Sequence, residues 1–203
     1  MRIYDLSPGG FAANTYLVTK GDTAVLIDCA SPAQTVLDAL KKSETALKAI
    51  LLTHGHFDHM LTVADVKTAT GAPLYLASGD ADLPADGEKN AYSLFFGTSR
   101  SYPDADRLFD DGDGLEFGEL SFKIISTPGH TRGSSVFLIG DVLFTGDTLF
   151  SAGYGRCDLY GGDMSALIAS LKKLSALPHD LKIYPGHDRT DTLGNAIQNL
   201  SFI

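Results

Sequence analysis

Three histidines and one aspartate lie within the stretch THGHFDHM, residues 53–60, directly after a run of four apolar residues. In an extended segment, residues two apart point the same way, so His54 and His56 can converge on one ion. Asp58 and His59 follow where the chain begins to turn, and they could serve a neighbouring ion. Imidazole and carboxylate together suit zinc, iron or manganese. The stretch therefore predicts a metal site at the end of a buried strand, with a surface histidine cluster or a hydrogen-bonded turn as the alternative.

Four ligand groups are few for two ions, so further ligands are expected after other buried strands. Three later apolar segments each end in a glycine-containing turn that carries such a group: His130 in TPGH, Asp147 in TGD and His187 in PGH. Glycine frees the backbone to turn, and one edge of a sheet can gather a site in this way from distant parts of the chain. Only His179, in a polar turn, falls outside the pattern, and we expect it to be a solvated loop residue.

The rest of the pattern alternates short strand-like runs with helical stretches, which is typical of layered α/β packing. Strands are expected at 2–6, 15–19, 24–28, 48–53, 73–77, 118–126, 135–139, 141–145 and 181–184, and helices at 31–42, 58–70, 164–174 and 193–200. The two strands joined at Gly140 are spaced as a hairpin, which favours mixed sheets over purely parallel ones. Residues 78–106 are the least regular part of the chain.

Length and composition limit the number of domains, the partners and the compartment that we expect for this protein. A chain of 203 residues, 44% hydrophobic and 20% charged, fits a single domain over residues 1–203. Its net charge of −9 disfavours nucleic acid as a partner, because an acidic surface repels phosphate. Two cysteines, Cys29 and Cys157, make no disulfide framework and suit a reducing compartment. With no apolar stretch of signal-peptide or membrane-span length, we expect a cytoplasmic protein without a membrane partner; homo-oligomerisation stays open.

The ordered series THGHFDH, TPGHT, TGDTLF and YPGH resembles that of the metallo-β-lactamase-fold hydrolases over essentially the whole chain. The resemblance implies a four-layer αββα sandwich, in which two mixed β-sheets are flanked by helices. It also implies a two-metal site at one edge of the sandwich. By that resemblance, the first metal has His54, His56 and His130 as ligands, the second has Asp58, His59 and His187, and Asp147 bridges both. Asp28, at the end of an apolar strand, would orient a ligand imidazole or cap a turn.

Two metals that share a hydroxide nucleophile favour hydrolysis of an activated acyl compound, and no serine or cysteine nucleophile is then required. Asp58 would act catalytically by orienting the hydroxide. Within the family, the run GDTLFSAGYGRCDLYGGD, residues 146–163, is similar to that of glyoxalase II-like (hydroxyacylglutathione hydrolase-like) enzymes of the short, single-domain branch. The substrate implied is a small acyl thioester of the S-2-hydroxyacylglutathione type. Zinc is the favoured metal, with iron or manganese as alternatives.

Candidate substrate contacts follow from the same resemblance. Arg156 could meet a substrate carboxylate or pair with Asp158, and Tyr154 lies beside it in the sequence. Tyr92 and Phe95, in the irregular segment, could contact substrate or pack that segment onto the core. The chain ends 16 residues after His187, so the C-terminal helical domain of glyoxalase II is not expected and glutathione dependence is left open.

Other functions fit the same motifs. A mononuclear iron persulfide dioxygenase would use only His54, His130 and Asp147 as ligands, and the complete set of ligand residues is shared with that branch. A lactonase and a non-catalytic metal-binding protein rank below both. A nuclease is disfavoured by the net charge, and a β-lactamase by the lack of a visible export signal.

Overall fold

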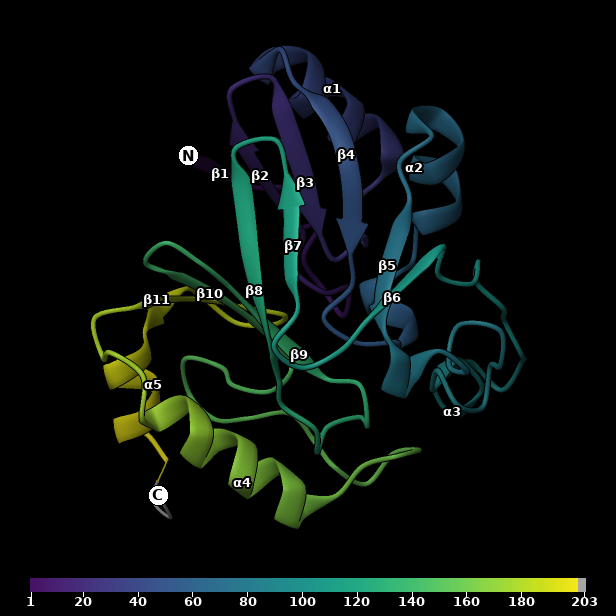
Figure 1. Cartoon of the computed structure of the whole chain (residues 1–203). Coiled ribbons are helices and arrows are strands. Elements are labelled where there is room, and N and C mark those ends of the chain that lie inside the picture. Colours follow the sequence, from purple (N-terminus) through teal and green to yellow (C-terminus); the bar gives the residue numbers. More distant parts are fainter. Residues whose placement is uncertain (201–203) are drawn as a thin grey trace.

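The computed structural model describes residues 1–200, whose strands form two six-stranded sheets, one from each half of the chain (Figure 1). The first sheet has the order β1-β2-β3-β4-β5-β6, with β1 Arg2–Asp5, β2 Tyr16–Lys20, β3 Thr23–Ile27, β4 Ala46–Leu51, β5 Leu74–Ala77 and β6 Arg107–Phe109. The second has the order β12-β11-β10-β9-β8-β7, with β7 Gly114–Phe117, β8 Leu120–Ser126, β9 Ser135–Ile139, β10 Val142–Gly146, β11 Lys182–Pro185 and β12 Asp191–Thr192. The helices are α1 Ala33–Ser43, α2 Val63–Thr70, α3 Tyr92–Phe96, α4 Met164–Ser175 and α5 Leu193–Gln198, with 3₁₀ turns at Phe57–His59 and Ser78–Asp80.

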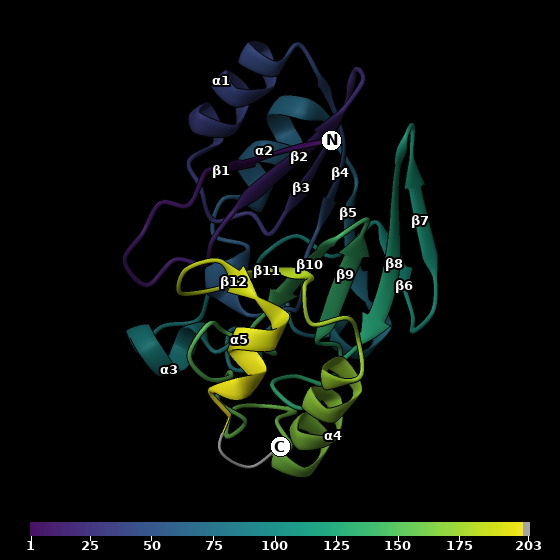
Figure 2. The same cartoon turned by 90° about the vertical axis from the view of Figure 1, so that its left-hand side faces the viewer.

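Three apolar clusters define four layers, helices–sheet–sheet–helices (Figures 1 and 2). Side chains alternate across a strand, so Ala24 and Leu26 of β3 pack with α1 and α2, while Val25 and Ile27 face the second sheet. A third cluster joins the outer face of the second sheet to α4 and α5. The four-layer αββα sandwich predicted from the sequence is therefore confirmed.

Both sheets are mixed, as predicted. In the first, β1, β2 and β3 pair antiparallel, whereas β3 to β6 pair in parallel. In the second, only β10 and β11 of the described strands pair in parallel. The hairpin of β9 and β10 turns at Gly140, whose φ of +57° lies in the left-handed region that glycine adopts without steric cost.

The parallel pairs bring the candidate ligand segments together. Because β3 and β4 run in the same direction, Asp28 and His54 lie at the same edge of the first sheet. Likewise β10 and β11 run in the same direction and end directly before Asp147 and shortly before His187. The site thus forms where the ends of these strands meet between the two sheets.

One predicted helix is interrupted. Residues 58–70 do not form a continuous helix: the 3₁₀ turn Phe57–His59 precedes α2, which begins at Val63. The carbonyl of His59 accepts a hydrogen bond from Cys29 N–H at 2.7 Å, and the N–H of Thr62 donates to the carbonyl of Cys29 at 3.1 Å. These bonds to a neighbouring segment replace intrahelical ones.

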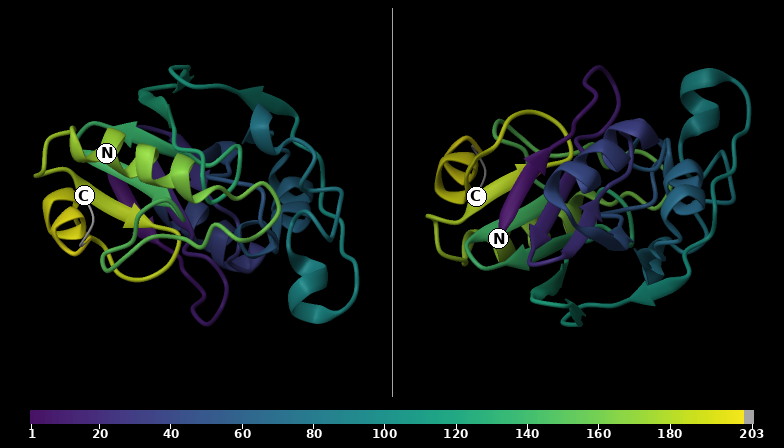
Figure 3. Two further views of the ribbon diagram at one scale, coloured as in Figure 1. Left: turned by 90° about the horizontal axis from the view of Figure 1, so that it is seen from below. Right: turned by 90° about the horizontal axis from the view of Figure 1, so that it is seen from above.

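Four short elements were not predicted: β6, β7, β12 and α3. They are two to five residues long, too short for hydrophobic periodicity to reveal. The segment 78–106, predicted to be irregular, contains α3, which lies at the periphery of the molecule (Figure 3). None of the helices among residues 1–200 has the length and apolar character needed to cross a bilayer.

Candidate metal centre

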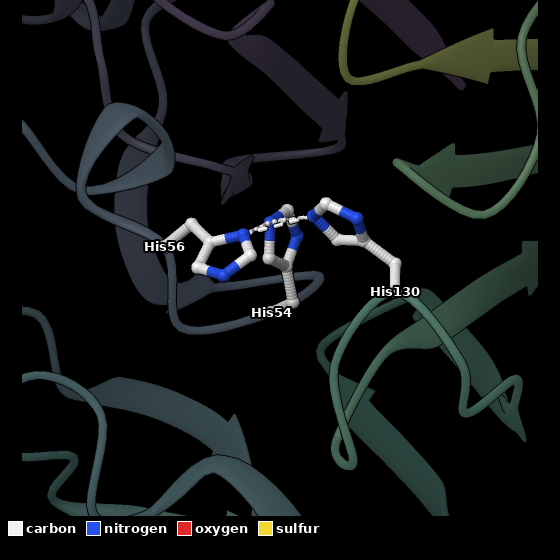
Figure 4. A group of neighbouring side chains, drawn as sticks. All are labelled: His54, His56 and His130. Atoms are coloured by element: carbon white, nitrogen blue, oxygen red, sulfur yellow. Dashed lines mark hydrogen bonds between the residues drawn. The ribbon is translucent and has the colours of Figure 1, made fainter. Parts of the chain in front are cut away.

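His54, His56 and His130 point their ring nitrogens at one common position (Figure 4). Nε2 of His54 lies 3.1 Å from Nδ1 of His56, which lies 2.8 Å from Nε2 of His130; the two Nε2 atoms are 3.1 Å apart. A tetrahedral zinc ion with Zn–N bonds of about 2.0–2.1 Å holds its ligand nitrogens roughly 3.3 Å apart. The triangle is therefore close to the size that such an ion requires.

The far nitrogens of two of these rings are already engaged. Nδ1–H of His130 donates to the carbonyl of Arg156 at 2.6 Å, and Nδ1 of His54 lies 3.2 Å from the hydroxyl of Thr53. A neutral imidazole has one N–H, so each Nε2 then turns a lone pair toward the other. Burial, reinforced by the surrounding imidazoles, lowers the pKa of His54 well below its usual value. Lone pairs that face each other in this way fit a cation between them.

A second set, Asp58, His59 and His187, lies beside the first. Nε2 of His187 is 3.1 Å from Oδ2 of Asp58. Asp147 lies between the two sets: its Oδ1 is 3.2 Å from Nε2 of His59, and its Oδ2 is 3.6 Å from Nε2 of His130. The structure thus brings together all seven side chains predicted as ligands, with Asp147 in the bridging position.

Unpaired buried atoms mark the same place. Among residues 1–200, four buried side-chain polar atoms have no hydrogen-bond partner, and two of them lie 3.2 Å apart in this cluster, Nε2 of His59 and Oδ1 of Asp147. A third, Nε2 of His56, belongs to the ring whose Nδ1 faces the common position of the first set. Buried polar atoms are nearly always satisfied in folded proteins. The unpaired atoms of His59 and Asp147 fit one cation, and the triangle of His54, His56 and His130 fits another.

Asp28 holds His59 in place. Nδ1–H of His59 donates to Oδ2 of Asp28 at 2.8 Å, and both side chains are almost fully buried. Thr53 also binds the Asp28 carboxylate: its N–H donates to Oδ1 at 2.9 Å and its hydroxyl donates to Oδ2 at 3.0 Å. Asp28 therefore orients an imidazole, the first of the two roles considered for it, with the unpartnered Nε2 of His59 turned toward the site.

The metal-free charges of the two sets differ. Burial, followed by the nearby His130, lowers the pKa of His56 to about 3. Burial would also lower the pKa of His59, but the carboxylates of Asp28 and Asp147 raise it well above its usual value. Asp147 responds in the opposite direction: burial raises its pKa, and the charge of His59, the largest opposing cause, brings it below the usual value. His54 and His56 are thus neutral without metal, whereas His59 holds a proton that a cation would displace.

Two glycines leave room for the site. A Cβ added to Gly186 would overlap Oδ1 of Asp147 and lie 2.6 Å from Cε1 of His59. At Gly155, a Cβ would overlap the carbonyl of Asp147 and lie 2.9 Å from Nδ1 of His130. The glycines beside the ligands are thus required by space as well as by the turns they form.

Sequence reasoning missed Asp80, a fully buried carboxylate. It accepts hydrogen bonds from Gly55 N–H at 2.9 Å, from the Thr131 hydroxyl at 2.7 Å and from Gly133 N–H at 2.7 Å. Gly55 lies between two candidate ligands, His54 and His56, and Thr131 follows a third, His130. Asp80 therefore ties the ligand loop of one sheet to that of the other.

The cluster opens into a cavity of about 540 Å³. Phe95 and Arg156, two predicted substrate contacts, line it, and Arg156 also pairs with both oxygens of Asp158 at 2.7 and 2.8 Å. The other two predicted substrate contacts, Tyr92 and Tyr154, do not line the cavity. Tyr92 stacks on Phe96 and packs against the apolar cluster that contains α1 and α2, whereas Tyr154 packs against the cluster that contains α4 and α5. Their predicted contact with substrate is therefore not supported by the geometry.

His179, expected in a solvated loop, is hydrogen-bonded to the carbonyl of Ser175 away from the site.

Known proteins resemble this chain along its whole length. The Probable metallo-hydrolase YqgX of Bacillus subtilis is 31% identical over 195 residues, which cover 94% of this chain and 92% of that protein. The Hydroxyacylglutathione hydrolase of Fuscovulum blasticum is 38% identical over 183 residues, which cover 89% of this chain and 63% of that protein.

Solved structures give the same result. The BLEG-1 B3 metallo-beta-lactamase superposes with a TM-score of 0.92 at 31% identity, covering 99% of each chain. TTHA1623 in a di-iron-bound form superposes with a TM-score of 0.86 at 34% identity, covering 98% of this chain and all of the other. The family model of the metallo-beta-lactamase superfamily matches residues 8–187, which span the whole ligand cluster. The chain belongs to the metallo-β-lactamase superfamily.

Proposed function

We propose that the protein is a metal-dependent hydrolase of small acyl thioesters. The observation that carries the proposal is the pair of ligand sets that meet at Asp147 beside a cavity of about 540 Å³. A cavity of that size takes a small molecule. Relatives named as a metallo-hydrolase and as a hydroxyacylglutathione hydrolase support hydrolysis and the thioester class.

Two divalent ions would be held by the seven converging side chains. The first set is His54, His56 and His130, the second is Asp58, His59 and His187, and Asp147 contacts both. When bound, such ions lower the pKa of a water ligand and polarise the substrate carbonyl. Zinc suits this mixture of imidazole and carboxylate, and iron is the first alternative because TTHA1623 has a di-iron-bound form.

Asp58 is the proposed catalytic carboxylate. It lines the cavity, and its Oδ2 is 3.1 Å from Nε2 of His187. Burial raises its pKa, but the hydrogen bond from His187 and the charge of His59 bring the pKa below the usual value, so it is ionised at neutral pH. A carboxylate in this place accepts a hydrogen bond from the attacking water and orients it toward the thioester carbon.

Water is the proposed nucleophile because the nucleophilic side chains that line the cavity are the carboxylates and imidazoles proposed to hold the metal ions. Among the described residues that line it, none is a serine, threonine, cysteine or lysine. Serine and cysteine are common nucleophiles of covalent acyl-enzyme routes. Direct attack by water at the acyl carbon, with release of the thiol, follows.

Metal analysis combined with turnover tests the proposal. Purified protein should hold two metal ions per chain and hydrolyse acetyl or lactoyl thioesters, and Asp58→Asn should reduce kcat by about 10²–10⁴-fold. Two bound ions without hydrolysis of any small thioester would contradict the proposal. Hydrolysis of a penicillin in its place would indicate a β-lactamase, and oxygen uptake with a persulfide by protein holding one iron would indicate a dioxygenase.

A further inference from the structure

Four phenylalanine rings form one wall of the cavity. Phe57 packs at the base, with ring centroids 5.5 Å from Phe95, 5.6 Å from Phe96 and 6.3 Å from Phe11. Phe11 and Phe96 meet edge-to-face at 5.9 Å. Phe11 comes from the loop between β1 and β2, Phe57 from the 3₁₀ turn Phe57–His59, and Phe95 and Phe96 from α3. Three segments distant in sequence thus build this wall. We call these four residues the aromatic wall.

The aromatic wall is partly open to solvent in the free protein. Phe57 is only 4% exposed, whereas Phe11, Phe95 and Phe96 are 61%, 55% and 46% exposed. Isolated exposed apolar residues are common, but contiguous aromatic rings at the mouth of a cavity are typical of a binding surface. Phe150 and Leu159 add to the apolar lining of the cavity, and the Phe150 ring centroid lies 6.1 Å from that of His187.

The cavity is poor in cationic groups. Arg156 is the only lysine or arginine among the described residues that line it. Its guanidinium already donates to both oxygens of Asp158, from Nε at 2.7 Å and from a terminal nitrogen at 2.8 Å. A glutathione thioester brings two carboxylates, which are recognised best by charge-assisted hydrogen bonds. A substrate with an uncharged apolar group needs no such charge-assisted hydrogen bonds.

We propose that the aromatic wall binds an apolar chain attached to the scissile thioester, so that the preferred substrate is a thioester with a hydrophobic arm and not an anionic tripeptide. This inference rests on the proposed function and names the substrate class of that same site. The apolar chain could belong to the acyl group or to the thiol, because a wall beside the metal ligands can receive either.

A series of thioesters tests both arms. In the first, N-acetylcysteamine carries acyl groups from acetyl to octanoyl; in the second, acetyl thioesters carry thiols of the same range of lengths. Burying a methylene favours binding about fourfold at full burial, so kcat/KM should rise roughly two- to fourfold per added methylene in one of the two series. S-Lactoylglutathione should show no advantage over lactoyl-N-acetylcysteamine.

Neighbouring residues on α3 supply a matched pair of variants. Phe95→Ala should reduce the octanoyl-to-acetyl ratio of kcat/KM by about tenfold, because it removes one ring of the aromatic wall. Leu94→Ala, at a residue 65% exposed that does not line the cavity, should leave that ratio unchanged. The Kd of the thioether S-octyl-N-acetylcysteamine, measured by calorimetry, should rise with Phe95→Ala and not with Leu94→Ala.

The outcomes separate the two proposals. Hydrolysis of acetyl thioesters with no length dependence in either series, or a tenfold preference for the glutathione carrier, overturns the aromatic-wall inference and leaves the hydrolase proposal standing. Failure to hydrolyse any thioester overturns the proposed function. In that case thioether binding still decides the inference, since equal Kd values for wild type and Phe95→Ala would overturn it as well.

Discussion

Replacing Asp28 with asparagine should weaken binding of the second metal ion and leave binding of the first nearly unchanged. Every neighbour of this carboxylate is a donor: Thr53 donates from its N–H at 2.9 Å and from its hydroxyl, and His59 donates from Nδ1 at 2.8 Å. An asparagine must therefore turn its NH₂ group toward one of these donors. If that group faces His59, Nδ1 has to become the acceptor and the proton moves to Nε2, which then has no lone pair for a metal.

The magnitude follows from the role of such partners. Loss of the group that orients a ligand imidazole typically weakens metal binding by about 10–100-fold, or roughly 1.4–2.8 kcal/mol. The second ion should lose this affinity, whereas the first, bound by His54, His56 and His130, should change less than about threefold because Asp28 touches none of those rings.

Competitive titration with a chromophoric chelator measures both steps. Asp22→Asn, at an exposed carboxylate, removes the same charge and serves as the control. If Asp28→Asn bound two ions with wild-type affinity, orientation of His59 by Asp28 would not matter to the site, and the reasoning would be refuted. An equal loss at both ions would instead mean that Asp28 acts by holding the whole fold.

Three further predictions concern the same centre. Gly186→Ala should abolish binding of the second ion, because its Cβ would overlap Asp147; a variant that binds two ions normally would contradict this. In metal-free protein the carboxylates keep His59 protonated, so its proton must leave when metal binds. Calorimetry in several buffers should therefore detect the release of at least one proton when metal binds. The affinity for the second ion should fall roughly tenfold per pH unit below the raised pKa of His59, and an affinity that does not change with pH would contradict this prediction. Asp80→Ala should lower the free energy of unfolding by roughly 2–5 kcal/mol, because the N–H groups of Gly55 and Gly133 lose their buried acceptor. Thermal or urea unfolding measures this loss, and a change of less than about 1 kcal/mol would contradict the prediction.

The convergence of the candidate ligands could be predicted because each follows a buried strand within a short local motif. Strand direction then brings the motifs together, since β3 with β4 and β10 with β11 run in parallel and end at the same edge. The layers could be predicted for a similar reason, because alternation of apolar residues within a strand is a local signal.

The features that could not be predicted from the sequence depend on contacts between residues that are distant along the chain. Asp80 lies in the irregular segment, and its backbone donors are 25 and 53 residues away along the chain. Phe11 joins the cavity only because the loop after β1 lies against α3. The choice between substrate and Asp158 for Arg156 needed the geometry of both guanidinium nitrogens. Tertiary packing decides each of these, and no local pattern reveals it.

Anomalous diffraction at the zinc and iron absorption edges, on crystals of protein purified without added metal or chelator, tests the central claim most directly. The account predicts two peaks of one metal, one among His54, His56 and His130 and the other among Asp58, His59 and His187, with Asp147 between them. A single peak at the first position, or none, would contradict a two-metal centre.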